Sequence, residues 1–169
     1  MTLKEQDVLV LLKLVVRGDG GFTYPELART LGMSTSEVHA ALRRASMAGL
    51  FNSAARTPNR PALLEFLIHG LKYVFVAERG GLTRGIPTGH AAPPLVGLLT
   101  TTSDPPLVWP DPNGAVRGES LKPLYRSVPR ATHDDEGLRE LLALVDAIRA
   151  GRARERRLAE KILTERLTG

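Results

Sequence analysis

Cysteine is absent from this chain of 169 residues, which excludes disulfide bonds and thiolate metal sites. Histidine does not replace it, because the four histidines lie too far apart in the sequence to form a local ligand pair. The chain also lacks a nucleotide-binding glycine loop, a zinc motif and a nucleophile elbow. We therefore expect no metal, no cofactor and no enzymatic activity.

Long apolar runs are missing as well. No segment approaches the ~20 consecutive apolar residues of a membrane-spanning helix. The amino terminus opens with Lys4, Glu5 and Asp7, which is not the basic and then apolar order of a signal peptide. We expect a cytoplasmic protein that binds no membrane, and its net charge of +5 weakly favours an anionic partner.

The composition changes twice along the chain. Residues 1–75 carry apolar residues at helical spacing, residues 76–133 are rich in proline and glycine, and helix-forming residues return in 134–169. The expected fold is mainly α, with a helix-turn-helix domain, a Pro/Gly-rich extended segment and a carboxyl-terminal amphipathic helix. We expect the middle segment to wrap over its own domain, and a docking surface for a protein partner is the alternative.

One capping pattern occurs three times in the first part and predicts where helices begin. It combines a hydroxyl at the helix N-cap with a carboxylate three positions later, so that each pair can satisfy two backbone N–H groups. The three copies are Thr2-x-x-Glu5, Thr23-x-x-Glu26 and Ser34-x-x-Glu37. Helices are therefore expected to start near residues 3, 24 and 35.

The second and third of these helices have the spacing of a helix-turn-helix. Ala28, Gly32 and Val38 supply the small packing residue, the turn glycine and the branched anchor of that motif. With the Gly-Leu-Phe exit at residues 49–51, the segment 3–60 resembles the winged-helix transcriptional regulators of the multiple-antibiotic-resistance (MarR) type. The resemblance implies a winged-helix-like domain whose third helix recognises duplex DNA.

The segment departs from that family at the wing. A wing needs two short alternating strands around a turn, whereas "NSAARTPNRP" is a basic loop that contains proline. A helix is expected to follow from about Arg60, with Asn59 as its N-cap. We therefore expect the wing to be short or absent.

The polar side of the third helix is the candidate reading face. At ~100° per residue, one side of the helix gathers the core-type residues Val38, Ala41, Leu42, Ala45 and Gly49. The predicted DNA-binding residues lie on the opposite side and in the following loop: Ser34, Thr35, Ser36, His39, Ala40, Arg43, Arg56 and Arg60. The alternative is that these are only the solvated residues of a three-helix domain.

Each polar group in this set suits a different part of the duplex. Arg43 can approach guanine, and His39 can donate or accept a hydrogen bond. The helix N-terminus at Ser34 suits a phosphate. Arg56 and Arg60 are placed to touch backbone phosphates, which positions a protein without specifying a sequence.

One pattern in the middle segment suggests an enzyme. "PDPNGAVRGESLK" is similar to the Pro-Asp…Glu-x-Lys constellation of metal-dependent nucleases. That constellation needs its Glu and Lys two residues apart on a strand, so that both face one metal site. Glu119 and Lys122 are three apart and would face opposite sides, so we set the nuclease hypothesis aside.

The leading hypothesis is a sequence-specific double-stranded DNA-binding protein, a bacterial-type transcriptional regulator that acts as a homodimer at an operator. The interrupted apolar stripe from Leu138 to Leu167 is expected to pair two subunits or to pack on the helix at 61–75. The alternative is a protein-interaction module, or an antitoxin-like partner-binding protein, in which the helix-turn-helix is partly scaffold.

Overall fold

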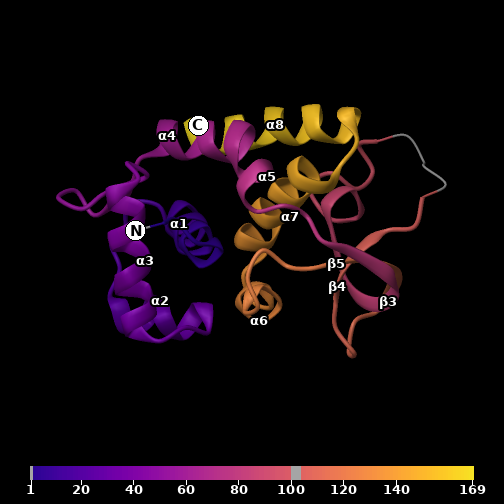
Figure 1. The fold of residues 1–169 in the computed structure, drawn as a ribbon, viewed down its shortest axis with the longest axis horizontal. Helices are drawn as coiled ribbons and strands as arrows, with labels where there is room; N and C mark the ends of the chain where they lie inside the picture. Colours follow the sequence, from indigo (N-terminus) through magenta and orange to yellow (C-terminus); the bar gives the residue numbers. More distant parts are fainter. Residues whose placement is uncertain (1, 100–103) are drawn as a thin grey trace.

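The amino-terminal half of the molecule consists of helices and one short hairpin (Figure 1). The computed structural model describes residues 2–99 and 104–169. Its first elements are α1 (Glu5–Arg17), α2 (Tyr24–Leu31), α3 (Thr35–Met47), β1 (Phe51–Asn52) and β2 (Thr57–Pro58). A continuous helical stretch follows, made of α4 (Arg60–Glu65), the π-helical turn η1 (Phe66–Gly70) and α5 (Leu71–Val74).

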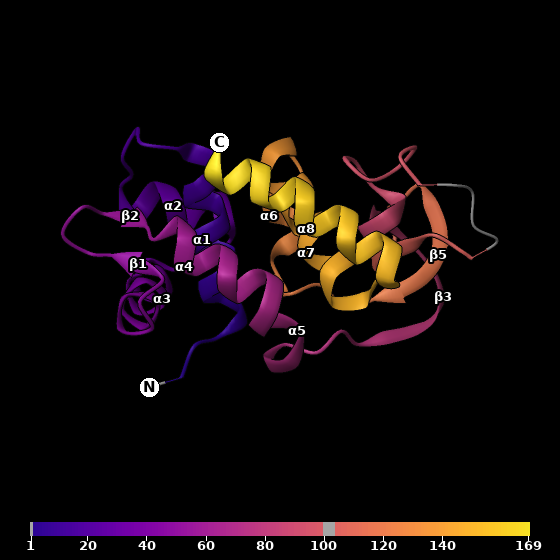
Figure 2. The same cartoon turned by 90° about the horizontal axis from the view of Figure 1, so that it is seen from above.

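The carboxyl-terminal half combines a sheet with further helices. The elements are β3 (Arg79–Thr88), the 3-10 turn η2 (Gly89–Ala91), β4 (Leu107–Pro110), β5 (Val116–Leu121), α6 (Val128–Thr132), α7 (Glu136–Ala150) and α8 (Ala153–Thr168). The sheet lies at the end of the molecule opposite to α3, with α7 between them, and α8 runs from the sheet side back to the amino-terminal helices, where the chain ends (Figures 1 and 2). Within the described residues, no helix is both long and apolar enough to cross a membrane.

Local capping sets the starts of the first helices. Thr23 Oγ1 accepts the N–H of Glu26 at 3.3 Å, and Ser34 Oγ accepts the N–H of Glu37 at 3.1 Å, as the capping pattern predicts. The first copy of the pattern behaves differently, because α1 begins at Glu5 and its N-cap is Lys4. The Asp7 carboxylate accepts the Lys4 N–H at 2.9 Å, so Thr2 does not cap this helix.

The expectation of a mainly α chain is wrong, because residues 76–133 contain a sheet instead of an extended loop. β3 pairs antiparallel with both β4 and β5, β4 pairs parallel with β5, and the three strands close into a small barrel. The closure needs glycine, since a Cβ at Gly85 would collide with the carbonyl oxygen of Trp109, and one at Gly118 with that of Pro106. The glycine content that suggested a loop therefore permits tight strand contact.

A second, two-stranded sheet follows α3 at the position of the expected wing. β1 and β2 pair antiparallel with Phe51 opposite Pro58 and Asn52 opposite Thr57, so each strand has only two residues. Asn59 then caps α4, because its side-chain oxygen accepts the N–H of Ala62 at 3.4 Å. The fold is therefore a mixture of helices and sheets.

One apolar core runs through both halves of the molecule. It includes Val38 on α3, Trp109 on β4 and Leu144 on α7, all fully buried. The carboxyl-terminal segment forms two helices instead of one, and α8 packs on both α4 and α7. Because Leu163 and Leu167 of α8 are 0% and 2% exposed, the apolar stripe is already covered within a single chain.

A buried carboxylate joins the sheet to α7. Asp146 Oδ2 accepts hydrogen bonds from Thr88 Oγ1 on β3 at 2.7 Å and from Trp109 Nε1 on β4 at 2.8 Å. Its other oxygen pairs with the Arg149 guanidinium at 2.8 Å. Both carboxylate oxygens of Asp146 have hydrogen-bond partners, so its charge has a structural role.

Candidate nucleic-acid interface

Helices α2 and α3 meet at a tight turn around Gly32. This residue adopts a left-handed conformation with φ of 65°, which glycine tolerates best. The N–H of Met33 then bonds to the carbonyl of Ala28 at 2.9 Å, which closes the carboxyl end of α2. The turn thus fixes the direction of α3 relative to α2.

Helix α3 presents one buried and one exposed face. Val38, Ala41, Leu42 and Ala45 are at most 4% exposed, as the helical periodicity predicts. On the other side and at the N-cap, Ser34, Thr35, Ser36, His39 and Arg43 are exposed, and Ala40 is half-buried. Gly49 is exposed and does not belong to the core face, because its φ of 80° takes the chain out of the helix.

His39 is held in place by an aromatic stack that the sequence did not suggest. Its ring lies 3.6 Å from that of Tyr24, with an interplanar angle of 11°. Phe22 in turn packs edge-on against Tyr24, with the ring centroids 5.6 Å apart. The stack covers one face of the imidazole ring, and the His39 side chain remains exposed to solvent. Tyr24 of α2 therefore orients His39.

Arg56 folds back onto the same aromatic cluster. It occupies the hairpin turn with φ of 58°, and its guanidinium lies 4.3 Å from the Phe22 ring centroid. It also donates a hydrogen bond to the Phe22 carbonyl at 3.1 Å. Arg56 therefore docks the hairpin on α2 and remains exposed beside α3.

Arg60 is directed inward instead of toward solvent. It is half-buried at the start of α4, and its guanidinium donates to the carbonyl of Val15 on α1 at 3.4 Å. The structure thus separates the two loop arginines that the sequence grouped together. Only Arg56 lies beside the exposed face of α3.

The two neighbouring arginines of α3 also differ, because one is engaged with another helix and the other is exposed. Arg44 makes a two-pronged ion pair with Asp7 of α1, through Nε and NH2 at 2.8 Å each. The hydrogen bonds to Asp7 raise the pKa of the Arg44 guanidinium above its ordinary value. Arg43 is exposed, and within residues 2–99 and 104–169 it makes no ion pair.

A hollow of about 360 Å³ lies between α3 and the hairpin. Its lining combines the exposed edge of α3 with the hairpin turn, and includes Tyr24, His39, Arg43, Ser46, Met47 and Arg56. Cationic and hydrogen-bonding groups thus border this groove, and the adjacent surface of α3 carries short side chains. This arrangement can accept a phosphodiester backbone beside a helix placed in a major groove.

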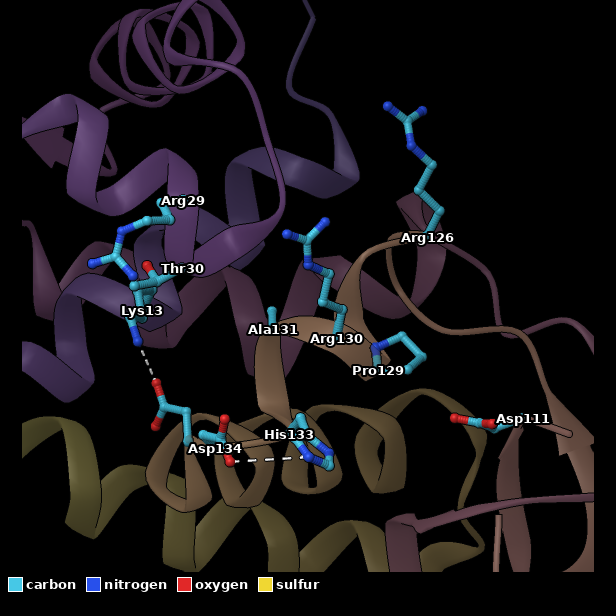
Figure 3. Close-up of a pocket in the computed structure, with 11 residues that line it drawn as sticks. Lys13, Arg29, Thr30, Asp111, Arg126, Pro129, Arg130, Ala131, His133 and Asp134 are labelled. Carbon is cyan, nitrogen blue, oxygen red and sulfur yellow. Dashed lines mark hydrogen bonds and ion pairs between the residues drawn. The ribbon is translucent and has the colours of Figure 1, made fainter. Parts of the chain in front are cut away.

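A second hollow, of about 680 Å³, lies between α1, α2 and the segment around α6. Figure 3 shows Arg29 of α2, Arg126 from the segment before α6 and Arg130 of α6 along one side of it. Asp111, His133 and Asp134 lie on the opposite side. Sequence reasoning missed Arg126 and Arg130, because they follow the end of α3 at Met47 by 79 and 83 positions and no local pattern links them to it.

The residues of the nuclease-like pattern are engaged in ion pairs. Glu119 of β5 pairs with Arg79 at 3.2 Å, and Lys122 pairs with Glu78 at 3.3 Å. No cluster of three or more His, Asp or Glu side chains suited to a metal ion occurs among the described residues. The polar groups around α3 are therefore the better candidate for a functional site.

Comparison with known proteins adds no relative, since no protein-family model, no curated protein and no solved structure matches this chain. The geometry around α3 is therefore what indicates a function.

Proposed function

We propose that this protein binds double-stranded DNA by placing α3 in the major groove, and that it regulates transcription from an operator. The observation that carries the proposal is the exposed face of α3, where short side chains surround Arg43, an arginine with no ion-pair partner in the described part of the chain. Short side chains let a helix approach base edges closely, and a free guanidinium can pair with guanine in the major groove.

The neighbouring cations support this assignment. Arg44 is paired with Asp7, so it is not available to a ligand, whereas Arg43 and Arg56 are exposed on the two sides of the same groove. An operator role is added by the resemblance of segment 3–60 to MarR-type regulators. A protein-interaction module that uses the helix-turn-helix as scaffold would need no such cations around α3.

Two copies acting together are part of the proposal. A single α3 with one free arginine would read few base pairs. In a pair of copies, binding of the first α3 would hold the second α3 at a high effective concentration near the adjacent half-site. Two-fold pairing also suits a palindromic operator. The molar mass of the complex with its selected duplex, measured by light scattering, tests for two copies against one.

The proposal is tested by selecting a duplex sequence from a random pool and comparing Arg43→Ala with the matched control Arg154→Ala. Arg154 is an exposed arginine on α8, so both variants lose one positive charge. We expect Arg43→Ala to weaken binding to the selected duplex by ~1–3 kcal/mol, with a smaller effect on an unrelated duplex. The control should change neither.

Two outcomes would contradict the proposal in different ways. If Arg43→Ala weakens binding to the selected and unrelated duplexes equally, Arg43 does not read a base. If the wild-type protein binds no duplex even at low salt, the partner-binding alternative is favoured over DNA recognition.

A further inference from the structure

The segment that leads into α6 packs against the turn between α2 and α3. A Cβ on Gly32 would lie 3.4 Å from the Cβ of Ser127 and 3.5 Å from the Cδ of Arg130. Arg126 reaches the first turn of α3, where its NH2 lies 4.0 Å from Glu37 Oε1. A part of the chain far from the helix-turn-helix in sequence is thus adjacent to its recognition helix.

This segment borders the side of α3 opposite to the hairpin. Glu37 and His39 are two residues apart and therefore point ~200° apart around the helix. His39 stacks on Tyr24, close to Arg56 of the hairpin, whereas Glu37 faces Arg126. The exposed face of α3 consequently has one arginine-bearing flank on each side.

Three arginines that line the hollow of about 680 Å³ are available to a ligand. Arg29, Arg126 and Arg130 are all exposed, and the contact of Arg126 with Glu37 is loose because its side chain is 76% exposed. Lys13, at the edge of the same hollow, is instead occupied by Asp135 at 2.5 Å. Figure 3 shows the three arginines spread along one side of the hollow, with Asp111 and Asp134 across it.

Exposed arginines suit an extended polyanion better than a small anion. A site for a small anion would enclose its arginines and remove water from them, whereas these three lie in the open. A nucleic-acid backbone offers a row of phosphates that several exposed guanidinium groups can contact without burial.

We propose that Arg29, Arg126 and Arg130 form an accessory phosphate-contact surface, which holds the DNA backbone beside the amino-terminal end of α3. The proposal rests on the proposed function and extends the DNA interface beyond residues 1–75, to residues that follow the sheet. The contact is to phosphates, so it adds affinity for any duplex sequence without changing which bases are read.

The experiment measures the salt dependence of duplex binding by fluorescence anisotropy for the double variant Arg126→Gln/Arg130→Gln. The matched control is Arg84→Gln/Arg117→Gln, which removes the same charge from exposed arginines of β3 and β5, at the end of the molecule opposite to α3 (Figure 1). Thermal unfolding of both variants verifies that each remains folded.

The double variant should reduce the slope of log K against log salt concentration by about 2, and should raise Kd at least about tenfold at moderate salt. The loss should be equal for the selected duplex and for an unrelated one, and the control should retain the wild-type slope. A double variant with the slope of the control overturns the accessory surface and leaves the proposed function standing. A wild-type protein with no salt-dependent duplex binding overturns both.

Discussion

At the scale of single residues, the ion pair of Asp7 and Arg44 distinguishes the two neighbouring arginines of α3. Arg44 stabilises the fold, whereas Arg43 is the proposed DNA contact. The Asp7 side chain is fully buried and that of Arg44 is only 11% exposed, and each is the charged partner of the other. Arg44→Ala should destabilise the fold by about 3–5 kcal/mol, because it leaves the buried carboxylate of Asp7 without its guanidinium. Urea unfolding followed by circular dichroism measures this change.

The matched control is the neighbouring arginine. Arg43→Ala removes an exposed side chain with no ion-pair partner in the described part of the chain, so its stability should lie within about 0.5 kcal/mol of wild type. Equal stability of the two variants would mean that the pair with Asp7 contributes little. It would also reopen Arg44 as a candidate DNA contact.

Residue-scale prediction from the sequence succeeds where the cause is local. The burial of Val38 and Leu42 follows from helical periodicity, and the Thr23 and Ser34 caps follow from a four-residue pattern. The pairing of Asp7 with Arg44 depends on how α1 crosses α3, 37 positions away, which no local pattern encodes. For the same reason the sequence does not anticipate that Tyr24 orients His39.

At the scale of elements, the barrel of β3, β4 and β5 depends on glycines that let strands approach closely. A Cβ at Gly85 would collide with the backbone of Trp109, which cannot move without opening the sheet. Gly85→Ala should therefore cost about 3 kcal/mol of stability. Gly81→Ala, on the same strand with nothing within 4 Å of the added Cβ, is the matched control and should be nearly neutral.

Chemical denaturation of the two variants checks this prediction, and equal midpoints would show that the strands can separate at little cost. The same glycines explain why the sheet was missed from the sequence. Strand prediction relies on alternating apolar and β-branched residues, whereas β3 reads "RGGLTRGIPT". Its strand pairing comes from long-range contacts with β4 and β5, which composition cannot reveal.

At the scale of the whole molecule, the continuous core ties the parts distinguished by composition into one unit. Leu163 of α8 and Trp109 of the sheet belong to the same apolar cluster as Val38 of α3. The carboxyl-terminal stripe therefore packs within the chain, so it does not need a second subunit to cover it. Removing α8 should damage folding before it affects pairing.

A continuous core predicts that the sheet and the helices unfold together. Trp109 is the only tryptophan, so its fluorescence reports on the sheet, while far-ultraviolet circular dichroism reports mainly on the helices. The two signals should give one midpoint in urea, and Leu163→Ala should lower both midpoints together, by about 2–5 kcal/mol in stability. Lys161→Ala, an exposed position on α8, should leave both unchanged.

Two separate transitions, with Leu163→Ala moving only one of them, would instead show that residues 1–75 fold independently. In that case the arginines of the α6 segment would be held against α3 only by a domain interface, and the accessory phosphate contact would depend on its closure.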